Sequence, residues 1–149
     1  MLGAPSLGFL DLWGARRTSI AASACVGSTL LSYLRRRDHP SLPHLPASGL
    51  TGLTLLPTLD LTGCAIEVIT NGTFAGATNL ASLNLSGGVL TAIASSAFAG
   101  STRLTELRLG NNSRLTHLSD GWLNGLAALP TLALTGCAIE AGTNCTFVG

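Results

Sequence analysis

The 149-residue chain has few charged residues, and this scarcity excludes two classes of protein. Charged side chains make up 10% of the sequence and hydrophobic ones 46%, so the chain is too apolar to be disordered throughout. Residues 42–149 hold three arginines and five acidic residues, a net charge of −2. This part lacks the cluster of cations that neutralises phosphates, and we therefore expect no nucleic-acid partner.

Recognisable catalytic and metal-binding motifs are also missing. The four cysteines form no Cys-x-x-Cys pair, which excludes a zinc knuckle. The three histidines are scattered, and the sequence contains no His-Glu-x-x-His motif, no Gly-x-Ser-x-Gly elbow and no P-loop. We therefore expect no enzymatic activity, no catalytic residue, no bound metal and no cofactor.

Leucine, in contrast, occurs 29 times and is placed at regular intervals. Residues 56–76 and 129–149 are identical at 16 of 21 aligned positions. The same Leu-x-x-Leu-x-Leu pattern occurs twice between them, so that units begin at residues 56, 80, 104 and 129. These spacings, 24, 24 and 25, indicate a repeat protein, in which each unit is stabilised by stacking on its neighbours.

Each unit predicts one short β-strand. Leu59 and Leu61 are two residues apart, which is the period of a strand, so both face the same side and the residues between them face the other. The chain then turns back, and an aromatic residue in each unit is expected to fill the far side of the core: Phe74, Phe98 and Phe147.

The third unit departs from this register. It carries one residue more than the first, at residues 111–115 against 63–66. The register then places Leu123 in the aromatic position and favours partial exposure of Trp122 on the convex side. The alternative is that Trp122 points inward.

The pattern Leu-x-x-Leu-x-Leu-x-x-Asn/Cys-x-Leu, followed by Phe, resembles the leucine-rich repeat family, in particular its typical 24-residue class known from extracellular eukaryotic proteins. The resemblance covers about two-thirds of the chain. It implies an α/β fold: a leucine-rich repeat solenoid with one short parallel β-strand per repeat on the concave face, and irregular or short helical turns on the convex side.

The resemblance also implies a ladder of buried polar side chains at the ninth position of each unit. This position holds Cys64, Gly88, Asn112 and Cys137, and cysteine can replace asparagine there as a weak donor. Gly88 has no side chain, which weakens the ladder in the second unit. Three strand spacings, about 14 Å, separate Cys64 from Cys137 and exclude a disulfide between them within one chain.

The same register, counted backwards, defines the expected domain boundary. Leu42, Leu45 and Leu50 precede core positions of the first unit by one repeat length, which predicts a half-repeat at 42–55 within a solenoid over residues 42–149. At this spacing Arg35 and Arg37 fall on core positions, so residues 32–41 are not expected to form a regular coil.

Residues 1–41 are therefore predicted as a non-repeat leader. It could be a short membrane segment, a secretory signal, or a poorly ordered segment packed on the first coil. The last unit is incomplete, and no cysteine-rich cap follows it, which favours a fragment of a longer array or a truncated product.

Side chains between the leucines point away from the core on the concave face and form the candidate ligand-binding set. The set consists of Thr58, Asp60, Ser82, Asn84, Glu106, Arg108 and Thr131. Arg108 is the candidate anchor, because arginine is enriched in binding hot spots. Glu106 stands two residues away on the same face, where it could hold the guanidinium ready for a carboxylate.

Binding is thus the function that the sequence favours. We expect a protein–protein interaction module with an unknown protein ligand, within a longer receptor-like protein that is extracellular or attached to a membrane. The alternatives are a structural or vestigial fragment without a ligand of its own, and the recognition arm of a multidomain enzyme such as a receptor kinase.

Four of the seven asparagines begin an Asn-x-Ser/Thr motif, which predicts N-glycosylation and passage through the secretory pathway. These residues are Asn71, Asn84, Asn111 and Asn144. A cytoplasmic location stays open.

Overall fold

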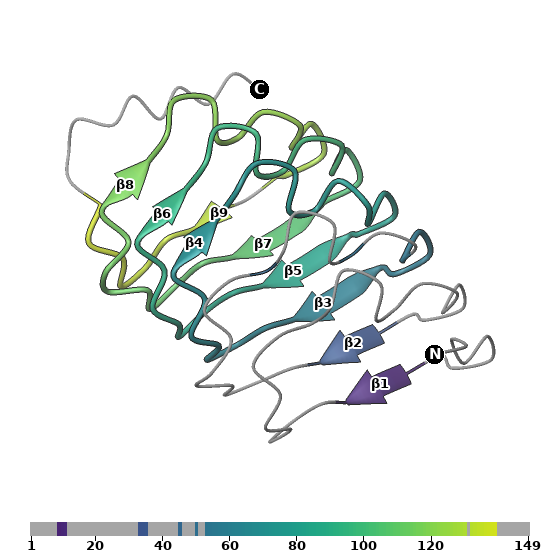
Figure 1. Cartoon of the computed structure of the whole chain (residues 1–149), viewed down its shortest axis with the longest axis horizontal. Helices are drawn as coiled ribbons and strands as arrows, with labels where there is room; N and C mark the ends of the chain where they lie inside the picture. Colours follow the sequence, from purple (N-terminus) through teal and green to yellow (C-terminus); the bar gives the residue numbers. More distant parts are fainter. Residues whose placement is uncertain are drawn as a thin grey trace.

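Parallel strands, one from each coil of the chain, form the frame of the molecule. Figure 1 shows the computed structural model, which describes residues 9–11, 33–35, 45, 50, 53–130 and 132–139. Six strands form one parallel sheet in the order β1-β2-β3-β5-β7-β9. Their bounds are Phe9–Asp11, Tyr33–Arg35, Thr58–Asp60, Ser82–Asn84, Glu106–Arg108 and Leu132–Ala133. Each strand pairs with the strand of the next coil, so the predicted solenoid is confirmed.

A second parallel sheet runs along the opposite side of the coils (Figure 1). It contains β4 (Val68–Ile69), β6 (Ala92–Ile93) and β8 (His117–Leu118), in that order. Turns and these two-residue strands make up the convex side of residues 53–130, where irregular or short helical turns were expected. No helix occurs among the described residues.

The leucine register produces the core. Leu59, Leu83 and Leu107 stand opposite one another in β3, β5 and β7, and each is at most 2% exposed. Burial of one leucine side chain contributes about 1.5–3 kcal/mol. Because each leucine is covered by the coils on both sides, the central coils stabilise one another.

Aromatic rings fill the far side of the core. Phe74 stacks on Phe98 with ring centroids 5.3 Å apart, and Trp122 continues the row at 6.3 Å from Phe98. Trp122 is 3% exposed, so the expectation that it is partly exposed is wrong, and Leu123 is half-buried beside it. Phe147 lies outside the described residues.

The extra residue of the third unit explains this difference. Ile93 pairs with Leu118, and the sequence distance between them exceeds the usual repeat length by one residue. Phe98 and Trp122, in contrast, are one usual repeat length apart in the sequence. The segment between Leu118 and Trp122 is therefore one residue shorter than its counterpart, which restores the original register. An indole offers a large apolar area for burial, and this favours Trp122 at the inner position.

The parallel sheet also begins before the boundary expected near residue 42. Leu34 of β2 pairs with Leu59 of β3, and the two residues are one position further apart in the sequence than the usual repeat length. This pairing puts Arg35 in register with Asp60. The expectation that residues 32–41 form no regular coil assumed the usual repeat length. This expectation is wrong for Tyr33–Arg35, which form a strand of the sheet. The observed pairing is shifted by one residue from the expected one, and such a shift exchanges the two faces of a strand, so that Leu34 and not Arg35 is in register with Leu59.

The half-repeat contributes to the core, since Leu45 and Leu50 are both buried. Apart from β1 and β2, the predicted leader at 1–41 lies outside the described residues. The extent of that leader stays a prediction.

Candidate functional site

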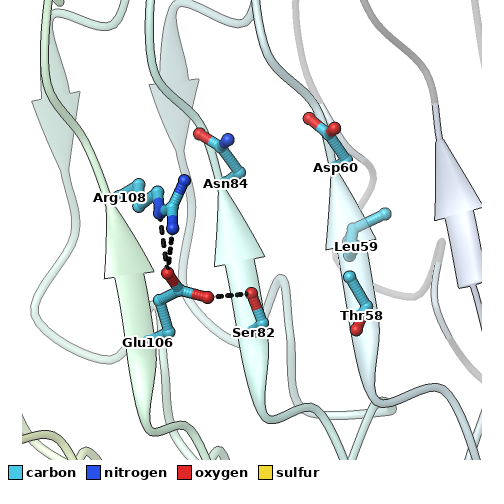
Figure 2. A pocket seen from close by; sticks show the side chains of 7 residues that line it. All are labelled: Thr58, Leu59, Asp60, Ser82, Asn84, Glu106 and Arg108. Atoms are coloured by element: carbon cyan, nitrogen blue, oxygen red, sulfur yellow. Dashed lines mark hydrogen bonds and ion pairs between the residues drawn. The ribbon is translucent and has the colours of Figure 1, made fainter.

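The open side of β3, β5 and β7 gathers six of the seven predicted binding residues around one hollow. The cavity has a volume of about 160 Å³. Thr58, Ser82 and Glu106 are paired in one row across the strands, and Asp60, Asn84 and Arg108 are paired in the next row. Together with Leu59 these residues line the cavity (Figure 2). Thr131 lies outside the described residues.

A chain of hydrogen bonds crosses from β5 to β7 within this cavity. Ser82 Oγ donates to Glu106 Oε2 at 2.6 Å. Arg108 Nε donates to Glu106 Oε1 at 2.7 Å, and Arg108 Nη2 lies 2.5 Å from the same oxygen (Figure 2). Figure 2 thus shows one carboxylate held between a hydroxyl and a guanidinium.

These contacts favour the ionised form of Glu106. The hydrogen bond from Ser82, followed by the hydrogen bond and the charge of Arg108, lowers the pKa of Glu106 below its usual value of 4.5. The side chains of Arg108 and Glu106 are 59% and 42% exposed, so solvent screens the pair and its contribution to stability is at most about 1 kcal/mol. The pair therefore contributes little to the stability of the fold.

Asp60 is buried, although the sequence predicts that it points away from the core with the rest of the candidate ligand-binding set. It is 4% exposed, and its Oδ1 accepts hydrogen bonds from Thr62 N at 3.1 Å and from Thr62 Oγ1 at 2.6 Å. Short polar side chains commonly bond the backbone two residues ahead in this way. The Asp60 carboxylate therefore stabilises the turn after β3.

Asn84 forms the equivalent turn after β5. Its Oδ1 accepts from Ser86 N at 3.0 Å, which fixes the orientation of the amide because a backbone N–H can only donate. Arg108 occupies the same repeat position in β7, but its side chain is long and turns sideways to Glu106. Equivalent positions of successive repeats thus differ in role: Asp60 and Asn84 bond the following turn, and Arg108 bonds Glu106.

The predicted ladder residues are buried or half-buried behind the strands. Asn112 is fully buried and donates through Nδ2 to Leu85 O at 2.9 Å and to Leu109 O at 2.6 Å, while its Oδ1 accepts from Leu90 N at 3.2 Å. Cys137 Sγ donates to Leu109 O at 3.2 Å. Cys64 is buried, and no disulfide joins it to Cys137.

Gly88 and Asn112 are complementary across two coils. A Cβ atom at Gly88 would lie 2.8 Å from Cys64 O and 3.0 Å from Asn112 Oδ1. The missing side chain therefore makes room for Asn112, which satisfies the backbone of the preceding coil at Leu85 and Leu90. Asn112 thus supplies hydrogen bonds to the second unit, where the sequence predicts a weakened ladder.

The candidate glycosylation sites differ in their surroundings. Asn71 is exposed and its Oδ1 accepts from Ser96 N at 3.2 Å; Asn111 is exposed with a φ of 59°. Asn84 is half-buried on the concave face, inside the cavity. Asn144 lies outside the described residues, and glycosylation at all four sites stays a prediction.

Neither a metal site nor a membrane-spanning helix is found in the described residues. No three His, Cys, Asp or Glu side chains come together in this part of the chain in a way that could hold a metal ion. None of the described segments forms a helix long and apolar enough to cross a bilayer.

No sequence motif indicates the hydrogen bond between Ser82 and Glu106. These two residues share one repeat position in successive units, so stacking the units in register would have brought them together. The pairing of Gly88 with Asn112 follows from the same alignment.

Comparisons with known proteins agree with this architecture. The sequence profile described as "Leucine rich repeat" matches residues 54–113 and 78–139, which together make up more than half of the chain. A crystal structure of a TLR13–ssRNA13 complex is similar with a TM-score of 0.87 and 28% identity, over 94% of this chain and 20% of that one. No curated protein sequence matches this chain significantly.

A crystal structure of human 5T4 (Wnt-activated inhibitory factor 1, trophoblast glycoprotein) shares the fold. Its TM-score is 0.67 at 18% identity, over 95% of this chain and 65% of that one. The chain therefore spans less than two-thirds of the length of either protein. The repeat register, the stacked parallel strands and the profile match agree with one another, and the chain belongs to the leucine-rich repeat family.

Proposed function

We propose that this chain is a protein-binding module and that its ligand contacts the concave face of β3, β5 and β7. The observation that carries this proposal is the polar cavity of about 160 Å³, in which Ser82, Glu106 and Arg108 form a hydrogen-bonded chain. These side chains contribute little to the core, and they hold an arginine in a defined position. Arginine so placed is typical of binding hot spots.

The proposal extends to a receptor-like protein, extracellular or attached to a membrane, of which this chain is a part. Two findings support it: the Asn-x-Ser/Thr motifs at exposed Asn71 and Asn111, and the likeness to TLR13 and to 5T4, the latter named a glycoprotein. The chain spans 20% of the TLR13 chain, so the partners of any whole protein are part of the proposal. The role proposed is binding without catalysis.

A protein ligand is favoured over a nucleic acid, although the TLR13 structure is that of a complex with ssRNA13. Residues 53–130 and 132–139 contain three arginines and no lysine, and Arg108 is already paired with Glu106. Binding of an RNA backbone requires neutralisation of several phosphates. The concave face described here offers one guanidinium.

Site-specific photocrosslinking tests the face and the partner class together. A photoreactive amino acid is placed at Thr105, beside β7, or at His117, on β8, in the full chain secreted by eukaryotic cells; both positions are exposed. We expect a protein adduct from Thr105 that excess unlabelled chain suppresses, and none from His117. Adducts from His117 alone, or adducts with RNA, would contradict the proposal.

Substitution of the anchor gives a second measurement on the same partner. Arg108→Ala should weaken association by more than about 1 kcal/mol. Its unfolding free energy should change by less than about 0.5 kcal/mol, as is usual for an exposed side chain. Ala133 occupies the equivalent position in β9, so the fold already accommodates alanine there.

A further inference from the structure

The cavity on the concave face holds more unused hydrogen-bond donors than acceptors. Arg108 has five N–H groups and uses Nε and one N–H of Nη2 for Glu106, which leaves three. Asn84 engages its Oδ1 with Ser86 N, and within the described residues its amide N–H groups have no partner. Three N–H groups of Arg108 and two of Asn84 are therefore without a partner among the described residues, and both side chains line the cavity (Figure 2).

The acceptors around the cavity are already largely used. Glu106 accepts a hydrogen bond from Ser82 and two from Arg108, close to the four that a carboxylate can accept. Asp60 is buried, and its Oδ1 accepts two hydrogen bonds from Thr62. A ligand that complements this surface must supply acceptors.

We propose that Arg108 and Asn84 form a carboxylate-binding site that receives an aspartate or glutamate side chain of a protein partner, and that Ser82 and Glu106 are positioning residues for Arg108. This inference rests on the proposed function and names the chemistry of the same site. Arg108 and Asn84 are register neighbours in β7 and β5 and line one cavity (Figure 2). A planar guanidinium and an adjacent amide can donate together to the two oxygens of one carboxylate.

Glu106 determines how this site attracts an anion. Because Glu106 neutralises Arg108 and the Asp60 carboxylate also lines the cavity, the site attracts an anion through directed hydrogen bonds and not through net positive charge. A phosphodiester chain gains most from several unpaired cations, which this face does not present among residues 53–130. A single carboxylate needs one guanidinium and a second donor, and both are present.

Ser82 acts through Glu106. Its hydroxyl bonds Oε2, while Nε and Nη2 of Arg108 both bond Oε1, so the carboxylate is fixed from both sides. Without the hydroxyl, the Glu106 carboxylate is free to rotate. Arg108 then loses its fixed orientation while its charge is unchanged.

Titration of the full chain with sodium acetate, followed by NMR of the Arg108 Nε–H and Asn84 side-chain N–H signals, tests the site without the unknown partner. Sodium chloride of equal concentration is the reference. We expect both signals to shift with one dissociation constant on the order of 10–100 mM, the range for one or two hydrogen bonds to a charged group. Arg114, exposed and outside the cavity, is the internal control and should show no saturation.

Two variants test the donors separately. Asn84→Asp replaces the donors with acceptors and is compatible with the turn, because Asp60 makes the same turn after β3. It should weaken acetate binding at least fivefold, and Arg108→Ala should abolish saturation of the Asn84 signal. Acetate binding by either variant as by the wild type would overturn the proposal, as would an equal response at Arg114.

A third variant separates positioning from simple support of the fold. Ser82→Ala should weaken acetate binding two- to threefold and raise the pKa of Glu106, and Ser82→Thr should restore both. An unchanged dissociation constant would overturn the role of Ser82. Tighter binding of dimethyl phosphate than of acetate would overturn the proposal and assign the site to a phosphodiester. If acetate does not bind but Thr105 still gives protein crosslinks, the carboxylate-binding site is rejected and the proposed binding function of the concave face is retained.

Discussion

Replacement of Asn112 with alanine should destabilise the protein by about 2–6 kcal/mol, although Asn112 is one polar side chain at the back of the strands. Asn112 is fully buried, and its three hydrogen bonds join Leu85 O, Leu90 N and Leu109 O. Leu109 O keeps its bond from Cys137 Sγ in the variant. Leu85 O and Leu90 N have no other hydrogen-bond partner in the described part of the chain, so two buried groups lose theirs.

The magnitude follows from these two groups. A buried backbone group without a partner costs about 1–3 kcal/mol, which gives about 2–6 kcal/mol for the pair. Domains of this size are typically stable by about 5–15 kcal/mol, so the variant loses a large share of its stability. The loss is expected in two adjacent coils, because Asn112 serves the coil that contains Gly88.

Guanidinium unfolding followed by far-UV circular dichroism measures the change. Asn124→Ala is the matched control, because Asn124 is an exposed asparagine that follows Asn112 in the same coil. It should change the free energy of unfolding by less than about 0.5 kcal/mol. Asn112→Cys should recover part of the loss, because Cys137 at the equivalent position donates to Leu109 O. A loss below about 1 kcal/mol for Asn112→Ala, with an unchanged m-value, would refute the reasoning.

Three further outcomes are expected. Trp122→Ala should lower the free energy of unfolding by about 3–5 kcal/mol and Leu123→Ala by less, since Trp122 is 3% exposed and Leu123 is half-buried; equal losses in chemical denaturation would contradict this. Glu106 has a lowered pKa, so its contribution of at most about 1 kcal/mol is present at neutral pH and lost as the pH falls through its folded-state pKa, and Glu106→Gln should remove this part of the acid dependence of unfolding. Secretion from eukaryotic cells should add a glycosidase-sensitive mass at exposed Asn71, which Asn71→Gln removes; a glycan at Asn84 would instead fill the concave cavity, and material carrying it should not bind acetate.

Periodicity in the amino-acid sequence was enough to define the repeat, the strand in each unit and the identity of the buried leucines. Leu59, Leu83 and Leu107 recur once per unit, and this period defines which side of each strand faces the core without knowledge of the neighbouring coil. It also placed Arg108 and Glu106 on the same open face. Alternation along a strand is a local property, and the sequence contains it in full.

Stacking of the coils, in contrast, determined how equivalent positions differ from one coil to the next. The space left by Gly88 admits Asn112, Asp60 is buried while Arg108 is exposed, and Trp122 rejoins the aromatic row. Each outcome depends on contacts between residues about one repeat apart, and on where a coil absorbs an extra residue. A pattern within one unit cannot contain that information, because packing and hydrogen bonding between coils are fixed only when the coils stack.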